Sequence, residues 1–329
     1  MSQLGIGVAT EAGLVPVVQE VAFRLDRGRT LCLVGESGCG KSVTARAILR
    51  LIDPPLRIAP GSRVLFDSSE LTDLPEAALR DVRGREIAMI FQEPMSALNP
   101  VRRVGAQVAE TLIRHRGLGR REALARAVEL LRQVGIPSPG QCIHRFPHEL
   151  SGGMQQRVMI AAAVGCEPKV LIADEPTTAL DPTIQGQILD LLWEMQDRLH
   201  MAILLITHDI GVVAEMAHEI AVMYAGSIVE AGPARDVLSA PRHPYTAALL
   251  RSIPRLRMAR DRPLNAIGGT VPAPSEWPPG CRFAPRCAHA FAPCARERPP
   301  SFACGSQVVA CWLAADPAAA PEGLERAGT

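Results

Sequence analysis

The sequence predicts an α/β fold, with a mainly parallel β-sheet covered by helices on both faces. Three observations favour it. Short apolar runs that suit buried strands alternate with stretches of helical periodicity. Hydrophobic residues make up 47% and charged residues 21% of the 329 residues, as in a protein with a packed core. The composition changes after about residue 240, which indicates a separate, irregular C-terminal extension.

The first part of the core is expected over residues 1–94. Residues 21–25 alternate apolar and polar side chains, which is typical of a half-buried strand. Residues 30–34 are continuously apolar and lead into a glycine-rich loop, so they are expected to form a buried strand. The apolar residues of the stretch 42–52 have helical spacing, which predicts a helix. The stretch 85–92 predicts another strand.

A helical subdomain is expected to interrupt the core over residues 95–155. Residues 95–150 show no strand pattern, and a helical stretch there ends at Gly135, with Pro137 just beyond it. The second part of the core is then expected over 156–238.

In this second part, two apolar runs, 169–176 and 202–209, predict buried strands. Between them, Asp181 as N-cap and Pro182 as first helical residue predict the start of a helix. The extension would cover 239–329, with a disordered end over 314–329.

The charge balance excludes a generally basic, nucleic-acid-binding surface. Lys plus Arg number 35 and Asp plus Glu number 34, so the net charge is +1. No apolar run approaches the roughly 18 residues that a membrane span needs, and the first residues show no signal-peptide pattern. We therefore expect a cytosolic protein that binds no nucleic acid.

The stretch GESGCGKS, residues 35–42, fits the pattern of a phosphate-binding loop between a strand and a helix. Its glycines Gly35, Gly38 and Gly40 allow the backbone N–H groups to turn toward phosphate. Lys41 would reach the β- and γ-phosphates, and the Ser42 hydroxyl would bind Mg²⁺. Glu36, Ser37 and Cys39 complete the predicted loop.

Two carboxylates follow the apolar run VLIA at its expected strand end. Asp174 would hold Mg²⁺, directly or through water. Glu175 would orient and deprotonate the attacking water. Together with the loop, this pair predicts a nucleoside triphosphatase.

Six motifs, in order over residues 15–235, resemble the ATP-binding cassette (ABC) family. They are the phosphate loop, FQEP with Gln92, LSGGMQQR at 150–157, VLIADEP, ALD with Asp181, and TH with His208. The resemblance implies a phosphate-loop ABC ATPase core with an inserted α-helical subdomain, which binds ATP and Mg²⁺.

The family resemblance also implies roles for single residues. Ser151, Gly152 and Gly153 would present N–H groups to the γ-phosphate held by a partner subunit. Gln92 would sense the metal and the attacking water, and His208 would contact the γ-phosphate. Because the sequence holds one loop and one signature, two ATPase subunits would have to share each site, with Asp181 at their interface.

Two positions depart from the family pattern. No aromatic residue precedes Phe23, so the sequence offers no aromatic side chain for stacking on adenine before the loop. Met154 stands where glutamine commonly follows LSGG, a variant that resembles the peptide-importer branch.

The stretches PRHPYTAALL (241–250) and GCRFAPRC (280–287) resemble the C-terminal extension of dipeptide and oligopeptide importer ATPases, which nickel importers share. The resemblance implies a peripheral subunit at the cytoplasmic face of the inner membrane. Its partners would be a second, different ATPase subunit, two membrane permeases and an extracytoplasmic substrate-binding protein. The alternatives are a nickel importer ATPase and a non-transport ABC ATPase with a metal- or redox-sensing tail.

The extension holds a small irregular group of cysteines. Cys281, Cys287, Cys294 and Cys311 are separated by five, six and sixteen residues, and Cys304 is an extra one. Free buried thiols, zinc and a [4Fe–4S] cluster on these four thiolates all remain open. The resemblance to the peptide-importer branch favours the cluster, whose negative charge nearby arginines could offset: Arg282, Arg286, Arg296 and Arg298.

Overall fold

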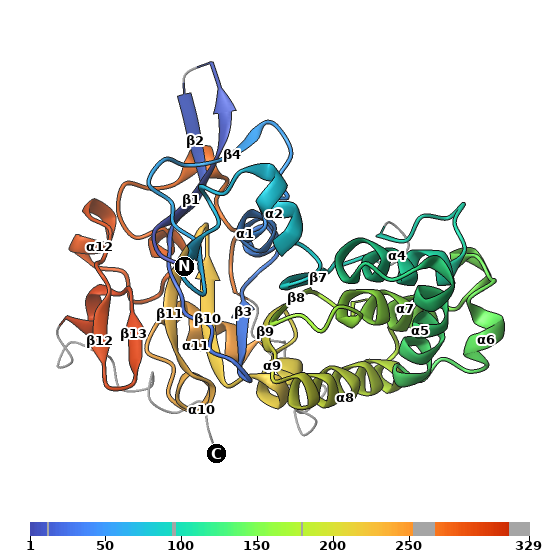
Figure 1. Cartoon of the computed structure of the whole chain (residues 1–329). Helices are drawn as coiled ribbons and strands as arrows, with labels where there is room; N and C mark the ends of the chain where they lie inside the picture. Colours follow the sequence, from blue (N-terminus) through green and yellow to red (C-terminus); the bar gives the residue numbers. More distant parts are fainter. Residues whose placement is uncertain (12, 94–96, 179, 253–266, 316–329) are drawn as a thin grey trace. The chain divides into compact units, whose positions relative to one another are not determined.

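The structure is a computed structural model, which describes residues 1–11, 13–93, 97–178, 180–252 and 267–315. The disordered end predicted over 314–329 begins too early, because Trp312–Ala314 forms a short 3-10 helix. The predicted end from residue 316 on lies outside these described residues. The chain forms two compact units (Figure 1). The first comprises Met1–Arg24, Leu31–Thr72 and Thr207–Thr329, and the second comprises Leu25–Thr30 and Asp73–Ile206.

A run of paired strands forms the centre of the first unit. β3 pairs in parallel with β10, with Leu31 opposite Glu219, and β10 pairs antiparallel with β11. β3 is buried at every residue, which confirms the strand predicted over 30–34. The order is β3 (Thr30–Val34), β10 (Glu219–Tyr224), β11 (Ser227–Pro233), β13 (Gln307–Val309) and β12 (Phe302–Cys304).

A smaller antiparallel sheet in the first unit has the order β2-β1-β4, with β1 at Leu4–Thr10, β2 at Gly13–Val21 and β4 at Leu56–Ile58. The strand predicted over 21–25 was wrong, because β2 ends at Val21. Beyond it, the backbone of Phe23 bonds with that of Met1, which accepts the Phe23 N–H at 3.2 Å. A short hairpin, β5 (Leu65–Phe66) with β6 (Ser69–Glu70), lies in the same unit.

The helices of the first unit are short. The helix predicted over 42–52 ends earlier, because Arg50 has a φ of 52°, outside the helical region. The helices are α1 (Lys41–Ile48), α9 (Ile210–Met216), α10 (Ala234–Ser239), α11 (Pro244–Arg251) and α12 (Ala292–Arg296).

The second unit holds three parallel strands in the order β9-β8-β7. These are β7 (Ile87–Ile90), β8 (Val170–Asp174) and β9 (Ala202–Thr207), which confirm the three apolar runs predicted there, with closer bounds. The residues of β9 are all buried, because a continuous apolar run suits a strand covered on both faces.

The described residues between 97 and 150 hold helices and no strand, as the sequence predicts. In Figure 1, α4, α5 and α7 lie side by side. The helices of this unit are α2 (Glu76–Val82), α4 (Val104–Arg116), α5 (Arg120–Gln133), α6 (Pro139–Cys142), α7 (Gly152–Val164) and α8 (Pro182–Leu199).

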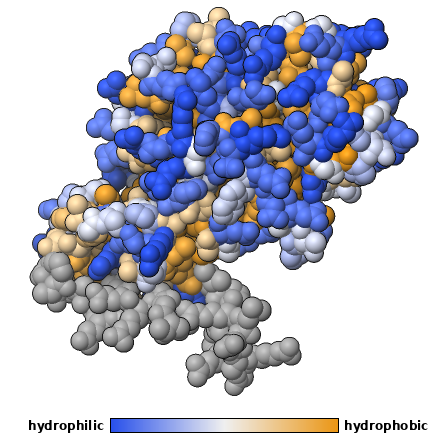
Figure 2. All heavy atoms as spheres, turned by 60° about the horizontal axis from the view of Figure 1, so that its bottom comes forward, coloured by the Kyte–Doolittle hydropathy of each residue, from blue (hydrophilic) through white to orange (hydrophobic). Residues whose placement is uncertain are grey.

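None of the helices that the structure describes is both long and apolar enough to cross a membrane. The face drawn in Figure 2 is mostly hydrophilic, with smaller hydrophobic areas between the polar side chains.

Candidate nucleotide-binding site

The loop at residues 35–40 connects β3 to α1 with a backbone that needs glycine. Gly35 and Gly40 have φ angles of 156° and 104°. A Cβ atom on Gly35 would lie 2.2 Å from the carbonyl oxygen of Met223 in β10, so no larger residue fits there. Gly38 also has a positive φ, of 80°, and is exposed. The sequence pattern of a phosphate-binding loop is thus matched by the conformation that this loop adopts.

Lys41 is the first residue of α1 and is buried, with 5% of its surface exposed. Its Nζ donates to the carbonyl oxygens of Gly35, at 2.8 Å, and Glu36, at 3.0 Å. The ammonium group therefore lies within the loop, where a phosphate group would meet it. Ser42, half-buried, follows on the first turn of α1, so its hydroxyl belongs to the same end of the helix.

Burial also affects Cys39, which the loop places in its interior with 1% exposure. Burial raises the pKa of the Cys39 thiol, while the nearby charge of Lys41 acts in the opposite direction. The thiol therefore stays protonated near neutral pH and acts as a small apolar side chain beneath the loop.

In the second unit, the end of β8 brings together two residues that the sequence predicts to act together. Gln92 Nε2 donates to Glu175 Oε2 at 3.0 Å, and Thr178 Oγ1 donates to the same oxygen at 2.8 Å. Glu175 has a φ of 48°, which is uncommon for a residue with a side chain and frequent at functional sites. Asp174, the residue before it, is fully buried.

The signature motif begins α7. Ser151 is the N-cap of this helix, and its Oγ accepts the Met154 N–H at 3.4 Å. Ser151 and Gly152 are exposed, so the start of this helix is accessible to solvent. A Cβ atom on Gly153 would lie 2.9 Å from Ile184 Cγ2 of α8, so the two helices approach closely there. Met154 takes part in the cap through its backbone alone, so its side-chain type does not affect this contact.

Asp181 caps α8 as predicted, because one of its carboxylate oxygens accepts the N–H groups of Thr183, at 3.1 Å, and Ile184, at 3.0 Å. His208 is exposed directly after β9 in the first unit. Asp209 then caps α9 by accepting the Gly211 N–H at 2.8 Å.

Three residues that contact predicted site residues were missed at the sequence level. Thr178 bonds Glu175, and its place three residues after the carboxylate is the only signal for it. The Tyr245 hydroxyl accepts the Glu36 N–H at 2.8 Å, and Arg286 binds the Glu36 carboxylate. Tyr245 lies in the stretch 241–250 that resembles importer ATPases, and Arg286 lies beside the cysteines, so neither position points to the loop in the sequence.

The nine cysteines, all among the described residues, are free thiols. Burial, together with the charges of Cys281, Cys287 and Cys294, raises the pKa of the Cys311 thiol to about 12. Within the described part of the chain, however, no group of three or more His, Cys, Asp or Glu side chains is placed to hold a metal ion. The expected [4Fe–4S] or zinc site is therefore not confirmed. Of the arginines expected to offset the charge of a cluster, Arg286 pairs with Glu36 instead.

Comparison with known proteins agrees with this geometry. Residues 18–178 match a family model described as ABC transporter, and residues 229–294 match one described as oligopeptide/dipeptide transporter, C-terminal region. The chain is 46% identical over 314 residues to the dipeptide transport ATP-binding protein DppD of Bacillus subtilis (strain 168), which covers 95% of this chain and 93% of that protein. It is 47% identical, over 95% of its length and 88% of the relative, to the oligopeptide transport ATP-binding protein OppD of the same strain.

Among solved structures, the dimeric post-hydrolysis state of the ATP-binding cassette MJ0796, bound to ADP and Pi, is similar with a TM-score of 0.61 and 26% identity. The match covers 70% of this chain and 99% of that one. The chain therefore belongs to the ABC transporter family as an ATP-hydrolysing subunit, in the group that carries the oligopeptide/dipeptide transporter C-terminal region.

Proposed function

We propose that this chain powers the import of di- and oligopeptides across the cytoplasmic membrane. One observation carries the proposal: a single chain combines the phosphate loop around Lys41 with a C-terminal region whose family model is described by oligopeptide and dipeptide transport. The relatives named for dipeptide and oligopeptide transport span nearly the whole chain, so they support the same substrate class.

The proposed assembly contains a second, related ATPase subunit, two membrane permeases and an extracytoplasmic substrate-binding protein. In it, this chain lies at the cytoplasmic face of the inner membrane and binds no nucleic acid. ATP-driven uptake of labelled dipeptides and oligopeptides into proteoliposomes that contain the whole assembly tests the proposal. Uptake of nickel ions but not of peptides would instead support a nickel importer.

We propose that the chain's own residues divide the work of hydrolysis. The phosphate loop, residues 35–42, binds the ATP phosphates, with Lys41 as the cation. Ser42 and Asp174 would hold Mg²⁺, for which a hydroxyl and a buried carboxylate are suitable oxygen ligands. When bound, Mg²⁺ would neutralise phosphate charge. Gln92, placed next to Glu175, would contact the same metal and the attacking water.

Glu175 accepts the proton of the attacking water in this proposal. Its hydrogen bonds from Gln92 and Thr178 fix one carboxylate oxygen, Oε2, and so orient the carboxylate that would accept the proton. His208 would contact the γ-phosphate. The helical signature subdomain of this proposal covers residues 95–155, between core parts 1–94 and 156–238, and the extension covers 239–329.

The signature would act on a nucleotide held by the partner subunit, so closure of the dimer can be tested separately. Ser151→Arg, made in a Glu175→Gln background, is expected to prevent the ATP-dependent dimer, because a long cation replaces an exposed cap at the anion-facing helix end. Size-exclusion chromatography with ATP measures the dimer, formed with itself or with the second ATPase subunit. The matched control is Ser69→Arg, in the exposed first residue of β6. An ATP-dependent dimer that forms equally in both variants would contradict the shared site.

A [4Fe–4S] cluster on Cys281, Cys287, Cys294 and Cys311 stays a proposal, with zinc as its alternative. Its support is that burial, and to a smaller extent the charges of Cys281, Cys287 and Cys294, raises the pKa of the Cys311 thiol, as expected when the four cysteines lie near one another. Anaerobically purified protein is expected to be brown and to contain about four iron and four sulfide per chain. Cys311→Ser should abolish the iron, and the matched Cys304→Ser should keep it. Colourless protein that holds zinc or no metal would reject the cluster.

A further inference from the structure

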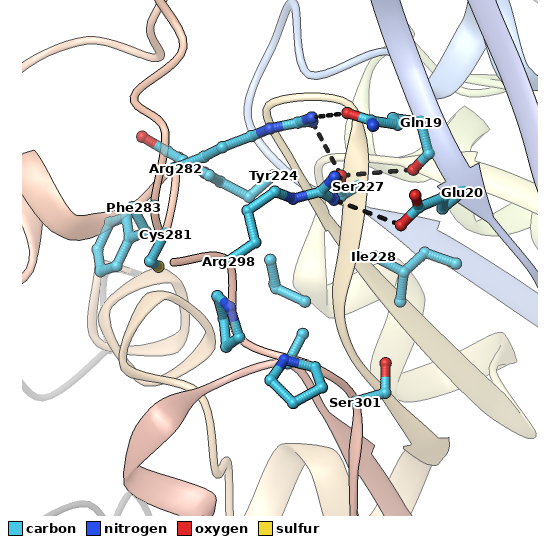
Figure 3. A pocket seen from close by; sticks show the side chains of 15 residues that line it. Gln19, Glu20, Tyr224, Ser227, Ile228, Cys281, Arg282, Phe283, Arg298 and Ser301 are labelled. Atoms are coloured by element: carbon cyan, nitrogen blue, oxygen red, sulfur yellow. Dashed lines mark hydrogen bonds and ion pairs between the residues drawn. The ribbon is translucent and has the colours of Figure 1, made fainter. Parts of the chain in front are cut away.

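The C-terminal extension is held against the rest of the first unit by a buried arginine. Arg282 is 7% exposed, and its guanidinium donates to the Ala225 carbonyl oxygen, to Ser227 Oγ at 2.9 Å and to Gln19 Oε1. Figure 3 shows this side chain extending from the extension toward Gln19 and Ser227. It also lies 3.4 Å from the centre of the Trp277 ring. Removing these contacts would leave several buried polar groups unpaired, so this segment is firmly placed.

Next to Arg282, an aromatic cluster joins this part of the extension to β10 and to α11, the first helix of the extension. Phe283 packs edge-on against Tyr224 of β10, with ring centres 5.2 Å apart. Tyr245 of α11 lies 4.7 Å from Tyr224 and 5.4 Å from Phe283, again between ring centres. All three rings are buried, so the chain that follows Phe283 leaves the cluster in a fixed direction.

The chain that follows Phe283 runs toward the phosphate loop and places Arg286 beside Glu36. Its two terminal nitrogens bind the two carboxylate oxygens of Glu36, at 2.6 and 3.0 Å. The Glu36 N–H donates to the Tyr245 hydroxyl at 2.8 Å, and the Glu36 carbonyl accepts from Lys41 at 3.0 Å. The backbone N–H, the carbonyl and the side chain of this one loop residue are therefore all held, two of them by the C-terminal region.

The Arg286 side chain is itself fixed and largely removed from water. It is 6% exposed, against 24% for the Glu36 side chain. Its Nε donates to the Gly268 carbonyl oxygen at 2.7 Å, and the hydrogen bonds to Glu36 raise the pKa of the guanidinium. A two-pronged arginine–carboxylate pair of this kind is stronger and more directional than an exposed ion pair.

The pair has an electrostatic consequence for nucleotide binding. Glu36 is the second residue of a loop that must bind an anion, and an unpaired carboxylate there would repel phosphate. Arg286 neutralises this carboxylate and holds it in one position. Tyr245 fixes the Glu36 backbone, on which the loop conformation depends.

We propose that Arg286 and Tyr245 are positioning residues for ATP binding, which act through Glu36 of the phosphate loop. The proposal rests on the proposed phosphate-binding role of this loop. It makes the C-terminal extension part of the ATP-binding apparatus of this chain, although the extension need not touch the nucleotide.

The test is ATP affinity of the full chain with Mg²⁺, measured by calorimetry in two backgrounds. Arg286→Gln is expected to weaken ATP binding by roughly tenfold at low salt, because a charge next to the phosphates is left unpaired. In a Glu36→Gln background, where no carboxylate needs neutralising, the same substitution should weaken ATP binding much less. Raising the salt concentration should shrink the effect in the wild-type background.

Arg296→Gln is the matched control, because Arg296 is an exposed arginine of the same extension. It should bind ATP as the wild-type chain does. An unchanged ATP affinity in Arg286→Gln would overturn the proposal. So would a loss of equal size in both Glu36 backgrounds, since that would indicate only general damage to the extension. Failure of the wild-type chain itself to bind ATP would instead reject the proposed role of the loop.

Tyr245→Phe tests the second contact separately, because it keeps the ring in the aromatic cluster and removes only the oxygen that accepts the Glu36 N–H. It is expected to weaken ATP binding several-fold in both Glu36 backgrounds, since the bond is made to the backbone. Wild-type ATP affinity in Tyr245→Phe would remove Tyr245 from the proposal.

Discussion

Replacing Glu175 by glutamine is expected to stop ATP turnover and to keep ATP bound in a closed dimer. Glutamine has nearly the same shape, and its oxygen can still accept the hydrogen bonds that Gln92 and Thr178 donate to Glu175. It cannot accept a proton from the attacking water, and a general base contributes about 10²–10⁴-fold to a rate. We therefore expect the rate of phosphate release by the purified assembly to fall by at least about 10²-fold.

The same substitution at Glu194 provides the matched control. Glu194 is exposed on α8, and its replacement by glutamine should leave phosphate release unchanged. Chromatography with ATP should detect a lasting dimer for Glu175→Gln alone. Phosphate release at the wild-type rate by Glu175→Gln would show that another group acts as the base.

Replacing Lys41 by alanine is expected to reduce ATP affinity by roughly 10- to 100-fold. A charge-assisted hydrogen bond contributes about 1.5–3 kcal/mol, and 1.4 kcal/mol corresponds to a tenfold change in affinity. Lys41 is buried within its loop, and the sequence holds one other lysine, Lys169. Calorimetric titration of the full chain with ATP and Mg²⁺ measures the loss.

Lys169→Ala removes a lysine of a different kind, because the Lys169 side chain is 42% exposed and pairs with Glu86 at 3.0 Å. This control should bind ATP as the wild-type chain does. If Lys41→Ala also bound ATP with unchanged affinity, the loop at residues 35–42 would not be the phosphate site. Because Lys41 also donates to two loop carbonyls, a thermal melt of both variants shows whether the fold is kept.

The strands that the sequence predicts correctly are those whose apolar pattern is contained within a few consecutive residues. β3, β8 and β9 are short, continuously apolar runs, so their burial can be predicted locally. β12 and β13 are three residues each, and they exist because β13 pairs with β11 far back in the chain. No local sequence pattern predicts a pairing between strands that are so far apart in the chain.

The same distinction holds for the candidate site. The loop glycines, Lys41 and the caps of α7 and α8 were predictable, because each acts within its own motif. The contact between Arg286 and Glu36 joins residues from opposite ends of the chain, whereas in the sequence this arginine stands beside the cysteines and suggests a role there. The cysteine spacing alone could not decide between free thiols and a metal site, because loops set the distances between them.

The pairing of Glu36 with Arg286 also has a consequence for protein synthesis, because this contact cannot form until residue 286 has been translated. The two residues are 250 positions apart. A ribosome that adds about 5–20 residues per second needs roughly 12–50 s between them. During that interval β3, α1 and the loop have left the ribosome without the arginine and tyrosine that hold Glu36. A nascent subunit would therefore gain its full affinity for ATP only near the end of translation, and a product truncated before residue 286 would keep its nucleotide motifs while binding ATP weakly.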